Sequence, residues 1–209
     1  MNKCQLLSAV FLLCTTGFAH GNLITNGGFE DEPTGAPIGG GSGWNYYSAD
    51  DIPGWDGDNL ELWINRNPDA YEGDYHAELN AHGSNTGAWE ISQSFDTVIG
   101  QAYDLFFAYS ARRGDSNSSN EAFQVKVDDL DFTLTDHVTG NWFTHSTSFI
   151  ADDYSTTLSF TSVNPVSQTL GNFLDDVRVS AAVPEPSIIV LLGTGLIGIA
   201  FARRRKTKV

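Results

Sequence analysis

The chain has 209 residues and a formal net charge of −15, with 26 acidic against 11 basic residues. A surface this acidic repels phosphate backbones and anionic lipid headgroups, so we expect no nucleic-acid partner. Both cysteines, Cys4 and Cys14, lie near the start of the chain. Disulfides and thiolate metal sites are therefore excluded for everything that follows them.

The first 19 residues predict a signal peptide. Lys3 precedes an apolar run at 6–13, and small residues precede a cleavage site after Ala19. An N-terminal membrane anchor is an alternative, but the run is too short to span a bilayer. A lipoprotein signal at Cys14 is another, although Leu13 stands where such signals need a small residue. We therefore expect an exported protein.

Residues 20–182 have the length of one domain, and they carry 25 acidic and five basic residues. Short alternating or β-rich runs bounded by Gly, Asn, Asp and Ser predict strands, with little sustained helical period. The expected strands are 22–25, 60–64, 75–80, 88–95, 102–111, 123–127, 131–135, 143–150, 156–163 and 173–180. Their number and spacing predict an all-β fold, a two-sheet antiparallel sandwich.

Two segments predict exposed loops, because neither buries enough apolar surface to join a core. They are the glycine-rich residues 39–43 and the polar residues 114–120. In the strand expected at 102–111, one face is apolar at period two and predicts core. Its residues are Tyr103, Leu105, Phe107 and Tyr109.

An ordered series of short motifs runs through the body. It comprises Asn-Leu-Ile-Thr-Asn-Gly-Gly-Phe-Glu at 22–30, Ile-Pro-Gly-Trp at 52–55, 72–80, 91–95, 100–103, 141–143 and Phe-Leu-Asp-Asp-Val-Arg-Val at 173–179. Together these residues resemble the galactose-binding-like jelly-roll domains of the choice-of-anchor C and plant cell-wall group. More distantly they resemble the carbohydrate-binding modules appended to xylanases. The resemblance implies a jelly-roll β-sandwich.

The same resemblance implies a calcium site. In that family the opening and closing strands lie side by side, and related modules bind a structural calcium there. Calcium takes six to eight oxygen ligands, so the metal candidates are Glu30 and one of Asp175 or Asp176. The alternative is that these residues are solvated carboxylates at a sheet edge.

Sugar binding calls for aromatic faces against C–H patches, with amides and carboxylates to meet hydroxyls. The aromatic candidates are Trp55, Trp63 and Trp89, together with Tyr46 and Tyr47, and a core position is the alternative for each. On the strand expected at 75–80, a polar face at period two supplies three further candidates. They are His76, Glu78 and Asn80.

We predict that the domain is not an enzyme. The five histidines include no His-x-x-x-His spacing, and no phosphate-binding glycine loop follows a strand and opens a helix. A glycoside hydrolase needs two carboxylates about 5–10 Å apart in a cleft. At this acid content, pairs such as Glu78 with Glu90 arise by chance.

The C-terminus begins with Val183-Pro184-Glu185-Pro186 and continues as an apolar run at 188–202 before five basic residues at 203–208. The run predicts a short transmembrane helix, although about 22 Å of helix is marginal against a hydrocarbon core of about 30 Å. The basic residues predict a cytoplasmic end. A plain tail anchor with a basic stop is one interpretation.

These C-terminal residues resemble the PEP-CTERM sorting signal of Gram-negative bacteria. The resemblance implies recognition by an exosortase, cleavage near Pro184, Glu185 and Pro186, and an inner-membrane intermediate before the cell surface or the extracellular space. Our leading hypothesis is an exported, non-catalytic module that binds polysaccharide of an extracellular, biofilm-type matrix or exopolysaccharide. The alternative is a structural matrix or adhesion protein without a small-ligand site, and a glycoside hydrolase is a third possibility.

Overall fold

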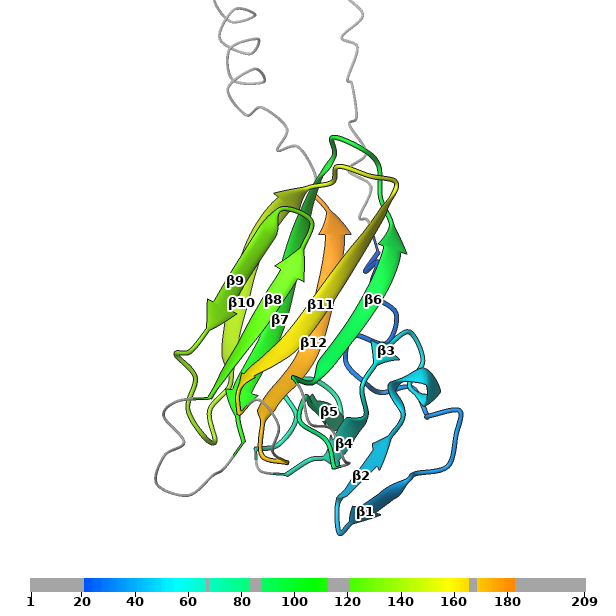
Figure 1. Ribbon diagram of the computed structural model, residues 1–209, viewed down its shortest axis with the longest axis vertical. Helices are drawn as coiled ribbons and strands as arrows, with labels where there is room; N and C mark the ends of the chain where they lie inside the picture. Colours follow the sequence, from blue (N-terminus) through cyan, green and yellow to red (C-terminus); the bar gives the residue numbers. More distant parts are fainter. Residues whose placement is uncertain (1–20, 67, 83–87, 113–120, 166–168, 183–209) are drawn as a thin grey trace, which may run out of the picture. The chain divides into compact units, whose positions relative to one another are not determined.

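Two antiparallel β-sheets make up the computed structural model, which describes residues 21–66, 68–82, 88–112, 121–165 and 169–182 (Figure 1). The described residues belong to one compact unit that ends at Ala182. The predicted all-β, two-sheet architecture is confirmed. The predicted signal peptide at 1–19 and the predicted C-terminal helix at 188–202 lie outside the described residues. Within those residues, no helix is long and apolar enough to cross a membrane.

One sheet has seven strands and the other has five. The larger has the order β1 (Gly39–Gly41), β2 (Trp44–Tyr47), β4 (Leu60–Ile64), β5 (Tyr75–Glu78), β12 (Asn172–Ala181), β7 (Ala102–Ala111) and β10 (Phe143–Ile150). The smaller has the order β3 (Asp56–Gly57), β6 (Glu90–Asp96), β11 (Ser155–Asn164), β8 (Ala122–Val127) and β9 (Leu130–Leu134). A single 3-10 turn, η1 (Ala49–Asp51), precedes β3 among the described residues.

The core lies between the sheets and follows the period-two pattern of the strands. On β7 the residues predicted to be core are all buried, and they pack with Phe123 of β8 and Phe160 of β11 from the other sheet. Asp104 on the same strand faces away from this core and is exposed. The alternation therefore fixes which face of β7 is buried.

Strand β12 contains a bulge that reverses its side-chain alternation. Asp175 pairs with Ala108 and Arg178 pairs with Phe106, so β12 has one residue more than β7 across this stretch. The extra residue lets Leu174 and Val177 both face the core although they are three positions apart.

The strand predicted at 22–25 is wrong, since these residues form turns. The segment still lies along β12, because Leu23 N donates to Val179 O at 2.8 Å and Val177 N donates to Gly27 O at 2.9 Å. A Cβ on Gly27 would lie 2.0 Å from the Val177 oxygen, so only glycine permits this approach. The expected adjacency of the opening and closing segments is thus present without a regular ladder.

The loop predicted at 39–43 is also wrong in part, because β1 pairs with β2 there. Glycine is a poor strand former, but here the neighbouring rings need its lack of a side chain. A Cβ on Gly39 would lie 2.6 Å from the Tyr46 ring, and one on Gly41 would lie 2.8 Å from Trp44 Nε1. The loop predicted at 114–120 lies outside the described residues.

Candidate functional site

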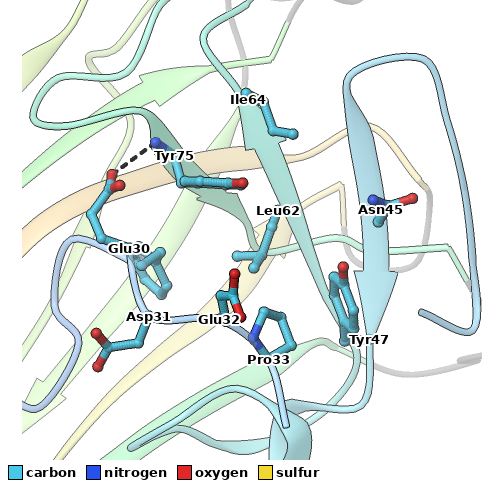
Figure 2. A pocket seen from close by; sticks show the side chains of 10 residues that line it. Glu30, Asp31, Glu32, Pro33, Asn45, Tyr47, Leu62, Ile64 and Tyr75 are labelled. Carbon is cyan, nitrogen blue, oxygen red and sulfur yellow. Dashed lines mark hydrogen bonds between the residues drawn. The ribbon is translucent and has the colours of Figure 1, made fainter. Parts of the chain in front are cut away.

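A pocket of about 200 Å³ lies at the β2, β4 and β5 part of the seven-stranded sheet (Figure 2). One wall is the segment from Phe29 to Pro33, which contains three consecutive acids. The other wall comes from the strands and includes the Tyr47 and Tyr75 rings, the Leu62 side chain and the Asn45 amide. The pocket therefore combines apolar ring surface with groups that accept or donate hydrogen bonds.

Glu30 is held in place by the turn before β5. Its Oε1 accepts hydrogen bonds from the backbone N–H groups of Asp74 and Tyr75, both at 2.8 Å. Gly73 has a φ of 66°, and a Cβ there would lie 2.2 Å from Glu30 Oε1, so glycine is needed for this contact. The second carboxylate oxygen has no hydrogen-bond partner among the described residues.

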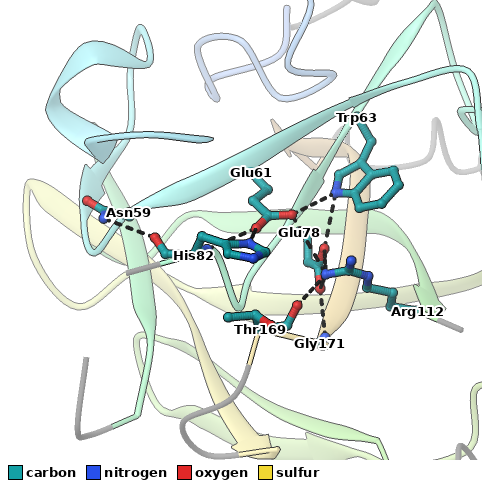
Figure 3. A network of polar contacts seen from close by, with 8 residues as sticks. All are labelled: Asn59, Glu61, Trp63, Glu78, His82, Arg112, Thr169 and Gly171. Carbon is teal, nitrogen blue, oxygen red and sulfur yellow. Dashed lines mark hydrogen bonds and ion pairs between the residues drawn. The ribbon is translucent and has the colours of Figure 1, made fainter. Parts of the chain in front are cut away.

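The opposite face of β4 and β5 carries a buried charged network (Figure 3). Glu61 and Glu78 are both fully buried. Arg112 Nη1 lies 2.8 Å from both oxygens of Glu78 and 3.7 Å from Glu61 Oε2. Trp63 Nε1 donates to both carboxylates, at 3.2 Å and 3.0 Å. One guanidinium and one indole thus serve two buried acids.

Burial raises the pKa of Glu78 well above its usual value, and the nearby Arg112 guanidinium opposes this rise. The guanidinium also lies 4.7 Å from the centre of the Trp63 ring, in a cation–π contact. His82 Nδ1 lies 2.5 Å from Glu61 Oε1, and its ring stacks on Trp44 at 4.8 Å. The network therefore extends from the buried acids to a partly exposed histidine.

His76 is fully buried beside this network, and neither ring nitrogen has a partner among the described residues. The rings of Phe173 and Trp142 lie 4.6 Å and 5.5 Å from it. Burial lowers the pKa of His76 to about 3. The side chain therefore packs as a neutral ring at physiological pH.

The structure brings four of the predicted sugar-binding residues together on one face of β4, β5 and the residues that follow β5. They are Trp63, His76, Glu78 and Asn80, and none is more than 5% exposed. Asn80 Nδ2 donates to Pro165 O at 3.0 Å. Because the side chains are covered, a sugar reaches them only if the covering segments move.

The other two tryptophan candidates lie elsewhere. Trp55 is buried in the core, where its ring lies 5.3 Å from Phe29 and its Nε1 donates to Asn26 O. Trp89 is also buried, just before β6, with its backbone N–H donating to Ser162 Oγ at 2.8 Å. Trp55 thus occupies the core position that was the alternative for each aromatic candidate.

The three calcium candidates do not share one site, because Asp175 and Asp176 have different partners. Asp175 Oδ2 accepts from the N–H groups of Tyr71 and Glu72, and its Oδ1 accepts from Asp176 N. Asp176 instead pairs with the Arg178 guanidinium. Burial raises the pKa of Asp175 to about 7, against the effect of its backbone donors.

Glu30 and Asp175 both lie near Gly28, together with Glu72, because a Cβ on Gly28 would lie 2.8 Å from Glu72 Oε2, 3.8 Å from Glu30 Cγ and 4.0 Å from Asp175 Oδ1. Across the described residues, no group of three His, Cys, Asp or Glu side chains is arranged to hold a metal ion. Calcium binding by Glu30 and Asp175 stays a prediction.

Sequence reasoning missed most of the pocket and the cation of the network. Tyr47 was among the candidate rings, but Asn45 was not, and both belong to β2, a strand that was not expected. The aromatic residues Trp44, Tyr46 and Tyr47 favour a strand there. Arg112 follows β7 directly, and nothing in the sequence pairs it with Glu78. Their partners are fixed by strand order, which local patterns do not encode.

Residues 22–180 match the family model described as "Protein of unknown function (DUF642)", and residues 182–206 match the PEP-CTERM protein-sorting motif. Halomucin of Haloquadratum walsbyi is 27% identical over 179 residues, covering 83% of this chain. The chain spans 2% of the length of that relative.

Several solved structures share the sandwich fold at low sequence identity. The arabinose-bound α-L-arabinofuranosidase MgGH51 is 12% identical with a TM-score of 0.51, covering 79% of this chain and 27% of that one. A CBM4 structure is 18% identical with a TM-score of 0.45, covering 76% and 99%. TmCBM61 in complex with β-1,4-galactotriose is 17% identical with a TM-score of 0.47, covering 78% and 99%.

At these identities the likeness concerns the fold alone. The sorting motif carries more functional content, because it indicates export, processing at the membrane and recognition by an exosortase. The chain belongs to the DUF642 family and ends in a PEP-CTERM protein-sorting motif.

Proposed function

We propose that the domain is a non-catalytic module that binds polysaccharide of the extracellular matrix or exopolysaccharide, at the cell surface or beyond it. The pocket in Figure 2 is the observation that carries this proposal. The Tyr47 and Tyr75 rings offer apolar faces to sugar C–H groups, while Asn45 and the carboxylates meet hydroxyls. Typical small-molecule sites have volumes of about 300–1,000 Å³. The smaller volume of this pocket suits one sugar unit of a longer chain.

Neither the buried acid pair nor the pair considered from the sequence has the arrangement of a hydrolase. Glu61 and Glu78 are the carboxylates that Trp63 and Arg112 bring together, but both side chains are fully buried. Glu90, the other acid considered with Glu78, lies on β6 of the opposite sheet and accepts from Thr161. A hydrolase needs its two carboxylates on either side of an accessible bond.

A glycan array probed with residues 20–182, with and without calcium, tests the proposal. Tyr47→Ala removes one pocket ring and is expected to abolish binding to the glycans that the unchanged domain retains. Tyr154→Ala removes a tyrosine that is 70% exposed and does not line the pocket, and binding is expected to persist. Absence of binding to every glycan, or equal loss in both variants, contradicts the proposal.

A structural or adhesion role without a small-ligand site is the second candidate, and an apolar end of the sandwich favours it. The turns at 97–100 and 151–154 are joined by bonds from Thr97 N to Tyr154 O and from Gly100 N to Ala151 O. The exposed apolar side chains at this end are Val98, Ile99, Ile150 and Tyr154. Several exposed apolar side chains on two bonded segments are typical of protein contacts.

This second role predicts concentration-dependent association in sedimentation velocity that Ile150→Ser weakens and that soluble sugars do not compete. A domain that stays monomeric at all concentrations argues against it.

A further inference from the structure

We propose that the pocket selects sugar units that carry a protonated amine, such as hexosamine residues without an N-acetyl group. This inference rests on the proposed function and adds the chemical class of the ligand. It follows from the charge of the pocket, the way Glu30 is held, and the two ring walls.

The charge of the pocket is negative and is not balanced. Among the described residues that line it, Glu30, Asp31 and Glu32 are acidic and none is basic. None of the three forms an ion pair with a described residue, whereas Glu78 and Asp176 each have an arginine partner. Like charges in a shared recess repel one another, and a bound cation relieves that repulsion.

Glu30 presents its charge in a fixed direction. Two backbone N–H groups hold Oε1, which leaves Oε2 without a partner among the described residues. A carboxylate that is already oriented loses little freedom when a ligand binds. An ammonium group is a compact donor of three hydrogen bonds, which suits such an acceptor.

The two rings favour a sugar over a bare cation. Tyr47 and Tyr75 are partly buried, and Leu62 lies in the same wall. Tyrosine faces attract cations and also pack against C–H groups, and an aminated sugar ring offers both. The Asn45 amide supplies a donor and an acceptor for a hydroxyl, which a lysine side chain does not have.

The test is calorimetric titration of residues 20–182 with three oligosaccharides of equal length. They are a β-1,4-linked glucosamine oligomer, its fully N-acetylated form and the corresponding glucose oligomer. At pH 6 and low salt, we expect the amine form to bind about tenfold more tightly than the acetylated form. Exposed carboxylates each contribute only about threefold to such a preference, and added salt reduces it.

Matched charge variants separate a pocket effect from a general attraction to an acidic protein. Asp31→Asn with Glu32→Gln removes two pocket charges, and the preference is expected to fall severalfold. Asp96→Asn with Asp129→Asn removes two exposed charges that do not line the pocket, and the preference is expected to persist. An equal fall in both variants overturns the inference, because it indicates attraction to the whole surface.

Other outcomes also decide the matter. If the acetylated or glucose oligomer binds as tightly as the amine form and Tyr47→Ala abolishes binding, the inference fails while the proposed function stands. If no oligosaccharide binds, the proposed function fails as well. If a lysine-containing peptide displaces the glucosamine oligomer at lower concentration than free oligomer does, the pocket recognises a protein cation and the inference is overturned.

Discussion

Replacing Arg112 by methionine tests whether one cation keeps two buried acids stable. The substitution keeps an unbranched apolar chain in place of the aliphatic part of arginine but leaves Glu61 and Glu78, both fully buried, without their guanidinium. Removing one partner of a buried ion pair costs about 3–5 kcal/mol. For a domain of this size that corresponds to a fall in Tm of about 6–20 °C.

The loss should depend on pH with a defined sign. Burial raises the pKa of Glu78. The contribution of this carboxyl group to the free energy of unfolding is therefore fully present below its pKa in the unfolded chain, and it is lost as pH rises through its pKa in the folded protein. Without Arg112 this loss grows, so the variant should be penalised more at pH 8 than at pH 5. Adding Glu78→Gln to the variant removes the unpaired charge and should restore part of the stability at pH 8.

Urea unfolding at the two pH values measures these differences by linear extrapolation. Lys126→Met is the control, because Lys126 pairs with Asp131 at 3.6 Å between two largely exposed side chains. That surface pair should contribute less than about 1 kcal/mol. A similar small loss for Arg112→Met, or a larger loss at pH 5 than at pH 8, would refute the reasoning.

Three further predictions concern the buried His76 and the contacts of Glu30. Burial lowers the pKa of His76 to about 3, so the contribution of this residue to stability fades as pH falls from about 6.5. His76→Phe should therefore flatten the dependence of the free energy of unfolding on pH between pH 7 and 4. Equal slopes in the two proteins would contradict this. Gly73→Ala should displace Glu30 and weaken glycan binding. The control is Gly100→Ala, which is also at positive φ but has no atom within 4 Å of the added Cβ, so it should cost only about 1 kcal/mol of backbone strain in thermal unfolding. Equal effects of the two substitutions would show that the Glu30 contact is unimportant. If Glu30 and Asp175 bind calcium, the metal at a hundred times its dissociation constant should stabilise the fold by about 2.7 kcal/mol in thermal unfolding. The double variant Glu30→Gln with Asp175→Asn should abolish this gain. An unfolding midpoint that calcium does not change would leave these acids as hydrogen-bond acceptors only.

The sequence predicted the architecture because alternation is a local signal. Tyr103 and Phe107 lie on the same face of β7, because they are an even number of residues apart. Their burial therefore follows from the pattern of this strand alone. The residues 22–25 have strand-like composition, but the close approach of Gly27 to Val177 bends the backbone into turns. That approach depends on a partner about 150 residues away and leaves no local trace.

The candidate site was less predictable for the same reason. Glu30 stood out as an acid in a motif, but its role depends on the turn at Gly73. Tyr47 lines the pocket because β2 pairs with β4, and an unexpected glycine strand pairs with β2 on its other side. His76 and Glu78 were correctly placed on one face of β5, but only the packed structure shows that this face is covered.

The position of β12 has a mechanical consequence. This strand lies between β5 and β7, it also bonds to the segment at 22–27, and it leads directly to the residues before Pro184. Tension applied to the domain through its C-terminal end acts along the strand. The ladder that joins β12 to β7 is then loaded in shear, with many hydrogen bonds sharing the load, whereas a terminal edge strand would be peeled one bond at a time. Leu23 bonds to Val179 close to both ends of the domain, so pulling from those two ends first separates the 22–27 segment from β12 one bond at a time. Pulling between the C-terminal end and an attachment near Ala111, at the far end of β7, loads the β12–β7 ladder in shear and should give the higher rupture force.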